Sequence, residues 1–260
     1  MTIENSTISG NGVHPTLGID TTPSIPENKG VELVGTTSSV VRDNTVTGNL
    51  ADGGIGIADD GPIDPGAPID PGAPHPGTLL ASTSNVVSGN TVSGNYGGCG
   101  IVLAAYNAGA GIFNNVVVGN TVTGKVKFFT SNGPVIGGIV VAADTPGTTV
   151  SNNTVAHNTD TDSFIPGIVV HSNSPGDVVS NNAIVGNTLD GDGWGTIDGP
   201  SEMVGILVGV GTTTSSLTNT TVAANRLTNE DYGIYVNGAT GTHVGGLPLD
   251  QASTPVVGLS

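Results

Sequence analysis

The sequence predicts an all-β fold, a parallel β-helix (solenoid) of about seven coils with three strands in each coil. Two alternating signatures predict it. The first is an apolar residue, two further residues, usually Asn, then Thr and a second apolar residue, as in residues 87–92. The second is Gly followed by alternating apolar residues, as in residues 100–103. The composition agrees, because 42 Gly and 3% aromatic residues suit short strands and tight turns rather than helices.

The first signature predicts a strand, a corner and a second strand. Its two apolar residues, such as Val87 and Val92, are five positions apart, so both face inward only if the chain bends between them. Asn at the bend tolerates the left-handed backbone of a sharp corner. Equivalent Asn and Thr side chains of stacked coils should then form ladders about 4.8 Å apart. The predicted ladders contain Asn44, Asn90, Asn120, Asn153 and Asn187, and Thr45, Thr91, Thr121, Thr154 and Thr188.

The Gly-Ile signature supplies the third strand, in which Ile101 and Leu103 face the interior. The residues between the inward positions therefore face outward and form an apolar row. Its members are Val102, Val140, Val169, Leu207 and Tyr235. Such a row predicts a homo-oligomer or a cover formed by another part of the same chain, and a bare surface is the third alternative.

The repeats span almost the whole chain, so residues 1–260 are expected to form a single domain. A Pro/Gly-rich loop insertion is predicted at 59–82, where a six-residue tandem excludes a regular strand. It is expected to protrude as a loop, with a lid or a docking arm as alternatives. An irregular tail is predicted at 238–260.

The net charge of −16 disfavours binding to nucleic acid or to anionic membranes. An anionic polysaccharide would need a bridging cation. No apolar stretch is long enough to span a membrane, and residues 1–4 lack the basic start and apolar core of a signal peptide. The lone cysteine, Cys99, excludes an internal disulfide.

The motif Asn-Thr-Val-Thr-Gly-Asn at 44–49, with the Gly-Ile strand that follows, resembles the right-handed parallel β-helix repeat proteins. That group includes NosD-type periplasmic proteins and the pectate-lyase-like superfamily. The resemblance implies a secreted, periplasmic or cell-surface protein that binds or processes a polysaccharide. If the protein is an enzyme, the resemblance implies a polysaccharide lyase or a glycoside hydrolase. The alternative is a non-catalytic structural or assembly module, such as a tailspike-like component.

The resemblance to the best-known enzymes of this group is incomplete. Residues 158–160 and 59–60 are similar to polygalacturonase motifs, but they occur in the reverse order. The Gly-His-Gly and Arg-x-Lys elements of those enzymes are absent from the sequence. The fold prediction is therefore more specific than any prediction of activity.

The loops that enter the Gly-Ile strands hold a first group of candidate site residues. Carboxylates beside aromatic rings are suited to holding sugars, and a pair of carboxylates can split a glycosidic bond. The candidate catalytic residues are Asp160, Asp162 and Asp192, and the candidate substrate-binding residues are Trp194, Phe128, Phe164 and Lys127. The alternative is that these are solvated turn residues and aromatic rings that cap the core.

A second group follows the Gly-Ile strands. Asp60, Tyr106, Asp144 and Asn173 each lie five residues after the first Ile of their strand, so they should stack on adjacent coils. Asp60 and Asp144 would be two coils, about 10 Å, apart, near the upper limit for the carboxyl pair of an inverting glycosidase. Tyr106 and His171 are the substrate-binding candidates here. Asp59, Asp60 and Asp144 form a candidate Ca²⁺ site.

Outward Thr-x-Thr rows suggest a remote alternative, a flat ice-binding face like that of some β-helical antifreeze proteins. The rows include Thr45 and Thr47, Thr91 and Ser93, and Thr121 and Thr123. On the predicted register this pattern fails at Ala156 and Asp190.

Overall fold

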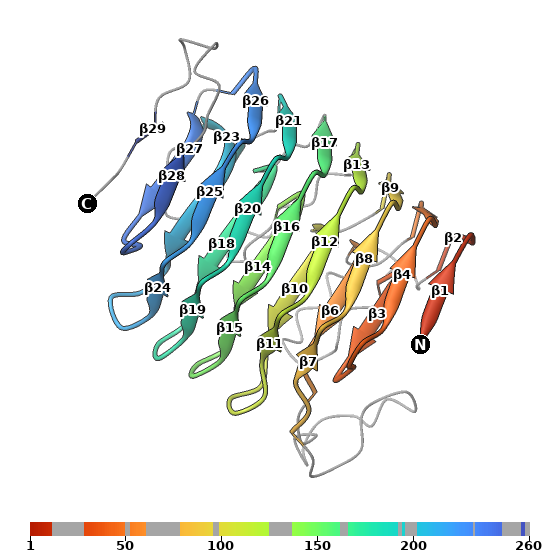
Figure 1. Ribbon diagram of the computed structural model, residues 1–260, viewed down its shortest axis with the longest axis horizontal. Helices are drawn as coiled ribbons and strands as arrows, with labels where there is room; N and C mark the ends of the chain where they lie inside the picture. The colour runs from red at the N-terminus through yellow and green to blue at the C-terminus, as the bar shows by residue number, and fades with distance from the viewer. Residues whose placement is uncertain are drawn as a thin grey trace, which may run out of the picture.

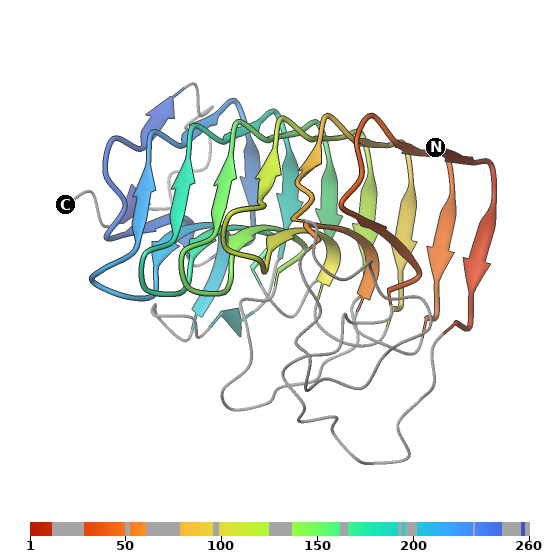
Figure 2. The ribbon, with the colours of Figure 1, turned by 90° about the horizontal axis from the view of Figure 1, so that it is seen from below.

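The computed structural model describes residues 1–11, 29–49, 53–60, 79–95, 99–124, 137–161, 166–191, 194–195, 202–230, 232–245 and 256–257. Within these ranges the chain is a stack of β-coils whose strands lie across its long axis (Figures 1 and 2). The strand β1 lies at one end of the stack and β28 at the other. None of the described segments forms a helix capable of crossing a membrane.

Consecutive coils contribute strands to four parallel sheets, which we name A to D in chain order. Sheet A contains β1 (Thr2–Glu4), β4 (Val40–Arg42), β8 (Val86–Ser88), β12 (Val116–Val118), β16 (Thr154–Ala156), β20 (Ala183–Val185), β25 (Thr221–Ala223) and β28 (His243–Gly245). Sheet B contains β2 (Thr7–Ser9), β5 (Thr45–Thr47), β9 (Thr91–Ser93), β13 (Thr121–Thr123), β17 (Thr159–Thr161), β21 (Thr188–Asp190) and β26 (Arg226–Thr228).

The other two sheets are C, which follows sheet B in the chain, and D, which has a strand in five of the described coils. Sheet C contains β3 (Val31–Val34), β6 (Gly53–Ala58), β10 (Cys99–Ala105), β14 (Ile139–Ala143), β18 (Ile168–Ser172), β23 (Glu202–Val210), β27 (Tyr232–Asn237) and β29 (Val256–Val257), with β22 (Trp194–Gly195) antiparallel to β23. Sheet D contains β7 (Ser82–Thr83), β11 (Ile112–Phe113), β15 (Thr149–Ser151), β19 (Val178–Ser180) and β24 (Ser216–Thr218).

The predicted parallel β-helix is confirmed, with a fourth strand in addition to the expected three. The sheet D strands have only two or three residues, with one buried apolar side chain at most, such as Ile112 or Val150, and this is too short a pattern to predict a strand. The C-terminal region also differs from the irregular tail expected at 238–260. β28 extends sheet A, and β29 pairs with β27, so parts of that region continue the coil.

The glycine of the Gly-Ile signature leaves room for the side chains of sheet B. A Cβ atom on Gly54 would lie 2.3 Å from Cγ1 of Val92 and 2.7 Å from the carbonyl oxygen of Gly100. Gly205 is similarly close to Leu227 and to the carbonyl oxygen of Gly233. The chain can therefore pass from sheet B into sheet C only where this position has no side chain.

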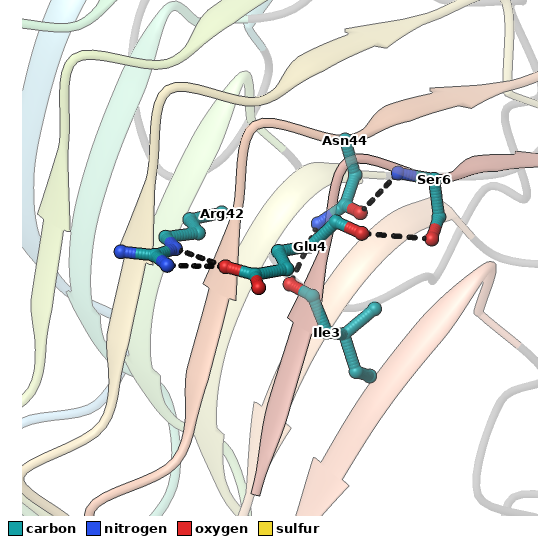
Figure 3. Close-up of polar contacts among 5 residues, drawn as sticks. All are labelled: Ile3, Glu4, Ser6, Arg42 and Asn44. Carbon is teal, nitrogen blue, oxygen red and sulfur yellow. Dashed lines mark hydrogen bonds and ion pairs between the residues drawn. The ribbon is translucent and has the colours of Figure 1, made fainter.

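At each sharp corner between sheets A and B, one residue adopts the left-handed backbone and the next residue, an Asn, bonds to the neighbouring coils. The left-handed residue is the one before the ladder Asn, for example Asp43 (φ 55°), Gly89 (φ 65°) and His157 (φ 54°). The Asn itself bonds between coils. Oδ1 of Asn44 accepts from the Ser6 amide at 3.0 Å, and its Nδ2 donates to the Ile3 carbonyl oxygen, beside the Arg42–Glu4 ion pair (Figure 3).

The asparagine ladders are confirmed, but one predicted member belongs to another corner. The ladder between sheets A and B contains Asn44, Asn90, Asn120, Asn158, Asn187 and Asn225. The predicted member Asn153 lies instead in a second ladder between sheets D and A, with Asn85, Asn115 and Asn182. Thr154 is displaced in the same way, because it lies in sheet A beside Val116 while Thr159 takes the place next to Thr121. The two corners carry the same residue pattern, so that pattern alone does not tell them apart.

Candidate functional site

Asp160 is not part of an exposed edge, contrary to the sequence prediction. It lies in β17 at the inward position that Val122 and Leu189 occupy in the neighbouring coils, and it is fully buried. Its Oδ2 fills the space where Gly138 has no side chain, 1.5 Å from the position of a Cβ atom. A catalytic role in contact with a polymer is therefore wrong for Asp160.

The side chains of the other residues of that predicted edge do not belong to the described part of the chain. Asp162, Asp192, Phe128, Phe164 and Lys127 lie outside the described residues, as do residues 61–78 of the Pro/Gly-rich insertion. The side chain of Trp194 is likewise not described, although its backbone pairs with Met203. This edge stays a prediction.

The second predicted group does assemble, at the carboxyl end of sheet C. The register of β10, β14 and β18 places Tyr106, Asp144 and Asn173 on three successive coils, one residue beyond their strands. Nδ2 of Asn173 donates to Oδ1 of Asp144 at 2.7 Å, which confirms the stacking of this pair. Within the described part of the chain, no donor bonds the other carboxylate oxygen, Oδ2.

The surroundings of Asp144 disfavour its charged form. Burial raises the pKa of the half-buried Asp144 carboxyl above its ordinary range, and the negative charge of Asp177 raises it further, while the bond from Asn173 lowers it in part. His171 is 1% exposed, with its ring close to the backbone of Gly209 and Gly211 in the next coil. His171 is therefore buried against the next coil, and its burial does not support the predicted direct contact with substrate.

Asp59 is a structural residue. Its oxygens accept the amides of Tyr106 (2.8 Å) and Asn107 (3.1 Å) and the Asn107 side chain (3.1 Å) in the next coil. Burial raises the pKa of Asp59, and these hydrogen bonds lower it in part. Asp60 is also buried, at 6% exposure, and its backbone pairs with Leu80.

The predicted Ca²⁺ site at Asp59, Asp60 and Asp144 finds no support in this geometry. Nowhere in the described ranges do three His, Cys, Asp or Glu side chains form a group that could hold a metal ion. Asp59 uses its oxygens to fix a turn, and the register separates Asp60 from Asp144 by two coils.

The predicted apolar row is buried within one copy of the chain. Val102, Val140, Val169 and Leu207 are between 0% and 7% exposed and form a second hydrophobic cluster outside the coil, with Tyr235 at its margin. The backbone of Gly137 lies against Val140 and Val169. Of the alternatives for this row, the bare surface is wrong, and a cover formed by the same chain accounts for the burial without a second copy.

Besides ladder members such as Asn115 and Asn158, the sequence prediction leaves two sets of residues without a role. Asn173 was placed in the stack but given no role, although it holds Asp144. Thr159 and Thr161 were assigned to no row, yet they continue the outward positions of sheet B. The spacing of the ladder could have identified these two threonines, because Asn158 follows Asn120 by 38 residues and directly precedes Thr159.

The fold and these stacked polar corners define a class of repeat protein. The family model described as "right handed beta helix region" matches residues 1–133, and the chain belongs to this family. A search of curated proteins gave no match. Among solved structures, the A-module of the mannuronan C-5 epimerase AlgE4 from Azotobacter vinelandii is 16% identical, with 88% of this chain and 77% of that chain covered and a TM-score of 0.22. A similarity at that level carries no inference about the activity of this chain.

Proposed function

We propose that this β-helix binds a polysaccharide at the carboxyl end of sheet C, around Asp144. The observation that carries the proposal is the Asp144–Asn173 pair. A half-buried carboxyl is oriented by an amide from the next coil, and its second oxygen has no donor among the described residues. Sugar hydroxyls donate well to such an oxygen, and the side-chain carbonyl of Asn173 is a second acceptor beside it.

The third member of the stack suits the same ligand. Tyr106 is half-buried on the coil before Asp144, about 4.8 Å away along the stack. An aromatic ring next to a few oriented polar groups is the usual composition of a small-molecule or sugar site. The repeated coils place such groups along a line, which suits an extended polymer better than a single sugar. The net charge of −16 favours a neutral polysaccharide over an anionic one.

Affinity electrophoresis in gels that contain neutral or anionic polysaccharides, each with and without Ca²⁺, tests the proposal. Asp144→Ala removes a hydrogen bond to a charged group, worth about 1.5–3 kcal/mol, so binding should weaken roughly 10- to 100-fold. Glu4→Ala is the matched control, because it removes one exposed carboxylate from the distant sheet A and should leave binding unchanged.

The same polysaccharides, assayed for reducing ends and for unsaturated products, separate binding from cleavage. Retention without products identifies a binding protein, and products that disappear in Asp144→Ala place Asp144 in the chemistry. The proposal is wrong if the wild type is retarded by none of the gels, or if Asp144→Ala and Glu4→Ala behave alike.

A further inference from the structure

The outer face of sheet B carries two columns of hydroxyl side chains. In β2, β5, β9, β13 and β17, both outward positions are Ser or Thr, and the strands are paired in register. We call these ten residues the hydroxyl face: Thr7, Ser9, Thr45, Thr47, Thr91, Ser93, Thr121, Thr123, Thr159 and Thr161. In β21 the array continues with Thr188 and then ends at Asp190.

The observed register removes one of the two interruptions predicted from the sequence. Ala156, which broke the pattern there, lies in sheet A beside Val118 and Val185. The position in sheet B next to Thr123 is Thr161. The hydroxyl face is therefore continuous over five strands, and Asp190 marks its end.

The spacing of the hydroxyl face is regular in both directions. Neighbouring strands are about 4.8 Å apart, and outward residues of one strand are about 6.7 Å apart, so the face measures roughly 19 Å by 7 Å between its outermost residues. The Asn ladder lies directly beside the first column, since Asn90 precedes Thr91 and Asn120 precedes Thr121. This ladder is buried and bonded from coil to coil, which holds the column at a fixed spacing before any partner binds.

The hydroxyls of this face are available to an external partner. Within the described ranges, the one hydrogen bond that they make is from Ser93 Oγ to Thr47 Oγ1, at 3.2 Å. Thr228, at the other end of sheet B, shows the contrasting case, because its hydroxyl bonds Asp190 at 2.8 Å. Five residues of the face are exposed, namely Thr7, Ser9, Thr45, Thr91 and Thr121, and the other five are half-buried.

The charge of the face indicates the kind of partner. The chain has 21 acidic residues and a net charge of −16, yet none of the ten positions is ionisable. A neutral face matches a neutral partner. Binding sites for protein partners are rich in Tyr, Trp and Arg side chains. A site for a crystalline glycan would contain aromatic rings on which the sugars stack. None of the ten residues is of these types.

We propose that the hydroxyl face binds the surface of ice. Ice presents flat, regular rows of oxygen atoms, each of which donates and accepts hydrogen bonds, as a Thr or Ser hydroxyl does. The flat, rigid and uncharged array therefore fits a neutral crystalline water surface, and it does not depend on the glycan site at Asp144.

Three measurements on the full chain test this proposal: thermal hysteresis, inhibition of ice recrystallisation, and uptake of the protein into slowly grown ice. The wild type should show all three. Thr121→Lys places a hydrated charge within the face, on the fourth of its five strands, and should abolish most of the hysteresis and uptake. Thr213→Lys makes the same change at an exposed turn residue outside sheet B and should keep both. Equal melting temperatures of the two variants exclude a folding defect.

Three outcomes overturn the proposal. One is a wild type that is excluded from ice, another is a Thr121→Lys variant that enters ice as the wild type does, and the third is binding to crystalline cellulose or chitin in place of ice. Asp144→Ala keeps this test separate from the glycan proposal, because that variant should enter ice unchanged whether or not it retains a polysaccharide.

Discussion

Replacement of Asn120 by Ala tests how much of the stability of the coil depends on its ladder. Asn120 is 1% exposed. Its Oδ1 accepts the amide and the Nδ2 of Asn90, both at 2.9 Å, and its Nδ2 donates to the carbonyl oxygen of Val87 at 3.0 Å and to Oδ1 of Asn158 at 2.9 Å. Asn90 Nδ2 and Asn158 Oδ1 keep other partners, whereas the Asn90 amide loses its partner.

A buried backbone amide left without a partner costs about 1–3 kcal/mol, so the variant should be less stable by about that amount. Urea unfolding followed by circular dichroism measures this loss as a lower midpoint. Thr121→Ala, at the exposed neighbouring position, is the control and should change stability by no more than about 0.5 kcal/mol. Hydrogen exchange at the Asn90 amide should accelerate in Asn120→Ala only. If the two variants unfold at the same urea concentration, the ladder does not carry the stability assigned to it.

Two further predictions concern glycine and pH. Gly138→Ala would place a Cβ atom 1.5 Å from Asp160 Oδ2 and 2.3 Å from the Gly167 carbonyl oxygen. It should lower stability by at least about 1–3 kcal/mol in the same urea assay. Gly245→Ala is the control and should be neutral, because no atom lies within 4 Å of its added Cβ. The pKa of Asp144 is raised, which means that the folded state binds this proton more tightly than the unfolded state does. The contribution of this group to stability should therefore fall as pH rises from about 4 through the raised pKa. Melting temperatures of Asp144→Asn should therefore fall less over that range than those of the wild type, and parallel curves would contradict the assignment.

The period of the sequence predicts the solenoid because each coil must repeat the same inward residues. It does not determine which corner a given signature occupies. Residues 150–155 fit the first signature in full, and residues 155–160 fit it except for Asp160 at the second apolar position. The pairing of Asn120 with Asn158 shows that residues 155–160 form the corner between sheets A and B. The same ambiguity concealed the buried position of Asp160 and the continuity of the hydroxyl face.

The candidate site was predictable where it follows the strand register. Counting from the first Ile of each sheet C strand placed Asp144 beside Asn173 correctly. The count does not reveal burial, so it could not separate the half-exposed Asp144 from the buried His171 and Asp59. His171 lies within β18, and Asp59 accepts backbone amides of the next coil, so their burial depends on contacts between coils that the count does not contain.

The stacking of coils along one axis determines how this molecule should respond to a mechanical load. A pull between β1 and β28 acts along the hydrogen bonds that join neighbouring coils, so the coils should detach one after another from an end. Successive residues of the ladder between sheets A and B are 46, 30, 38, 29 and 38 positions apart from Asn44 onward. Each detached coil would release roughly 100 to 160 Å of extended chain. The unequal lengths of the coils should thus appear in a force–extension trace as an ordered series of unequal steps, from which the detaching end can be identified.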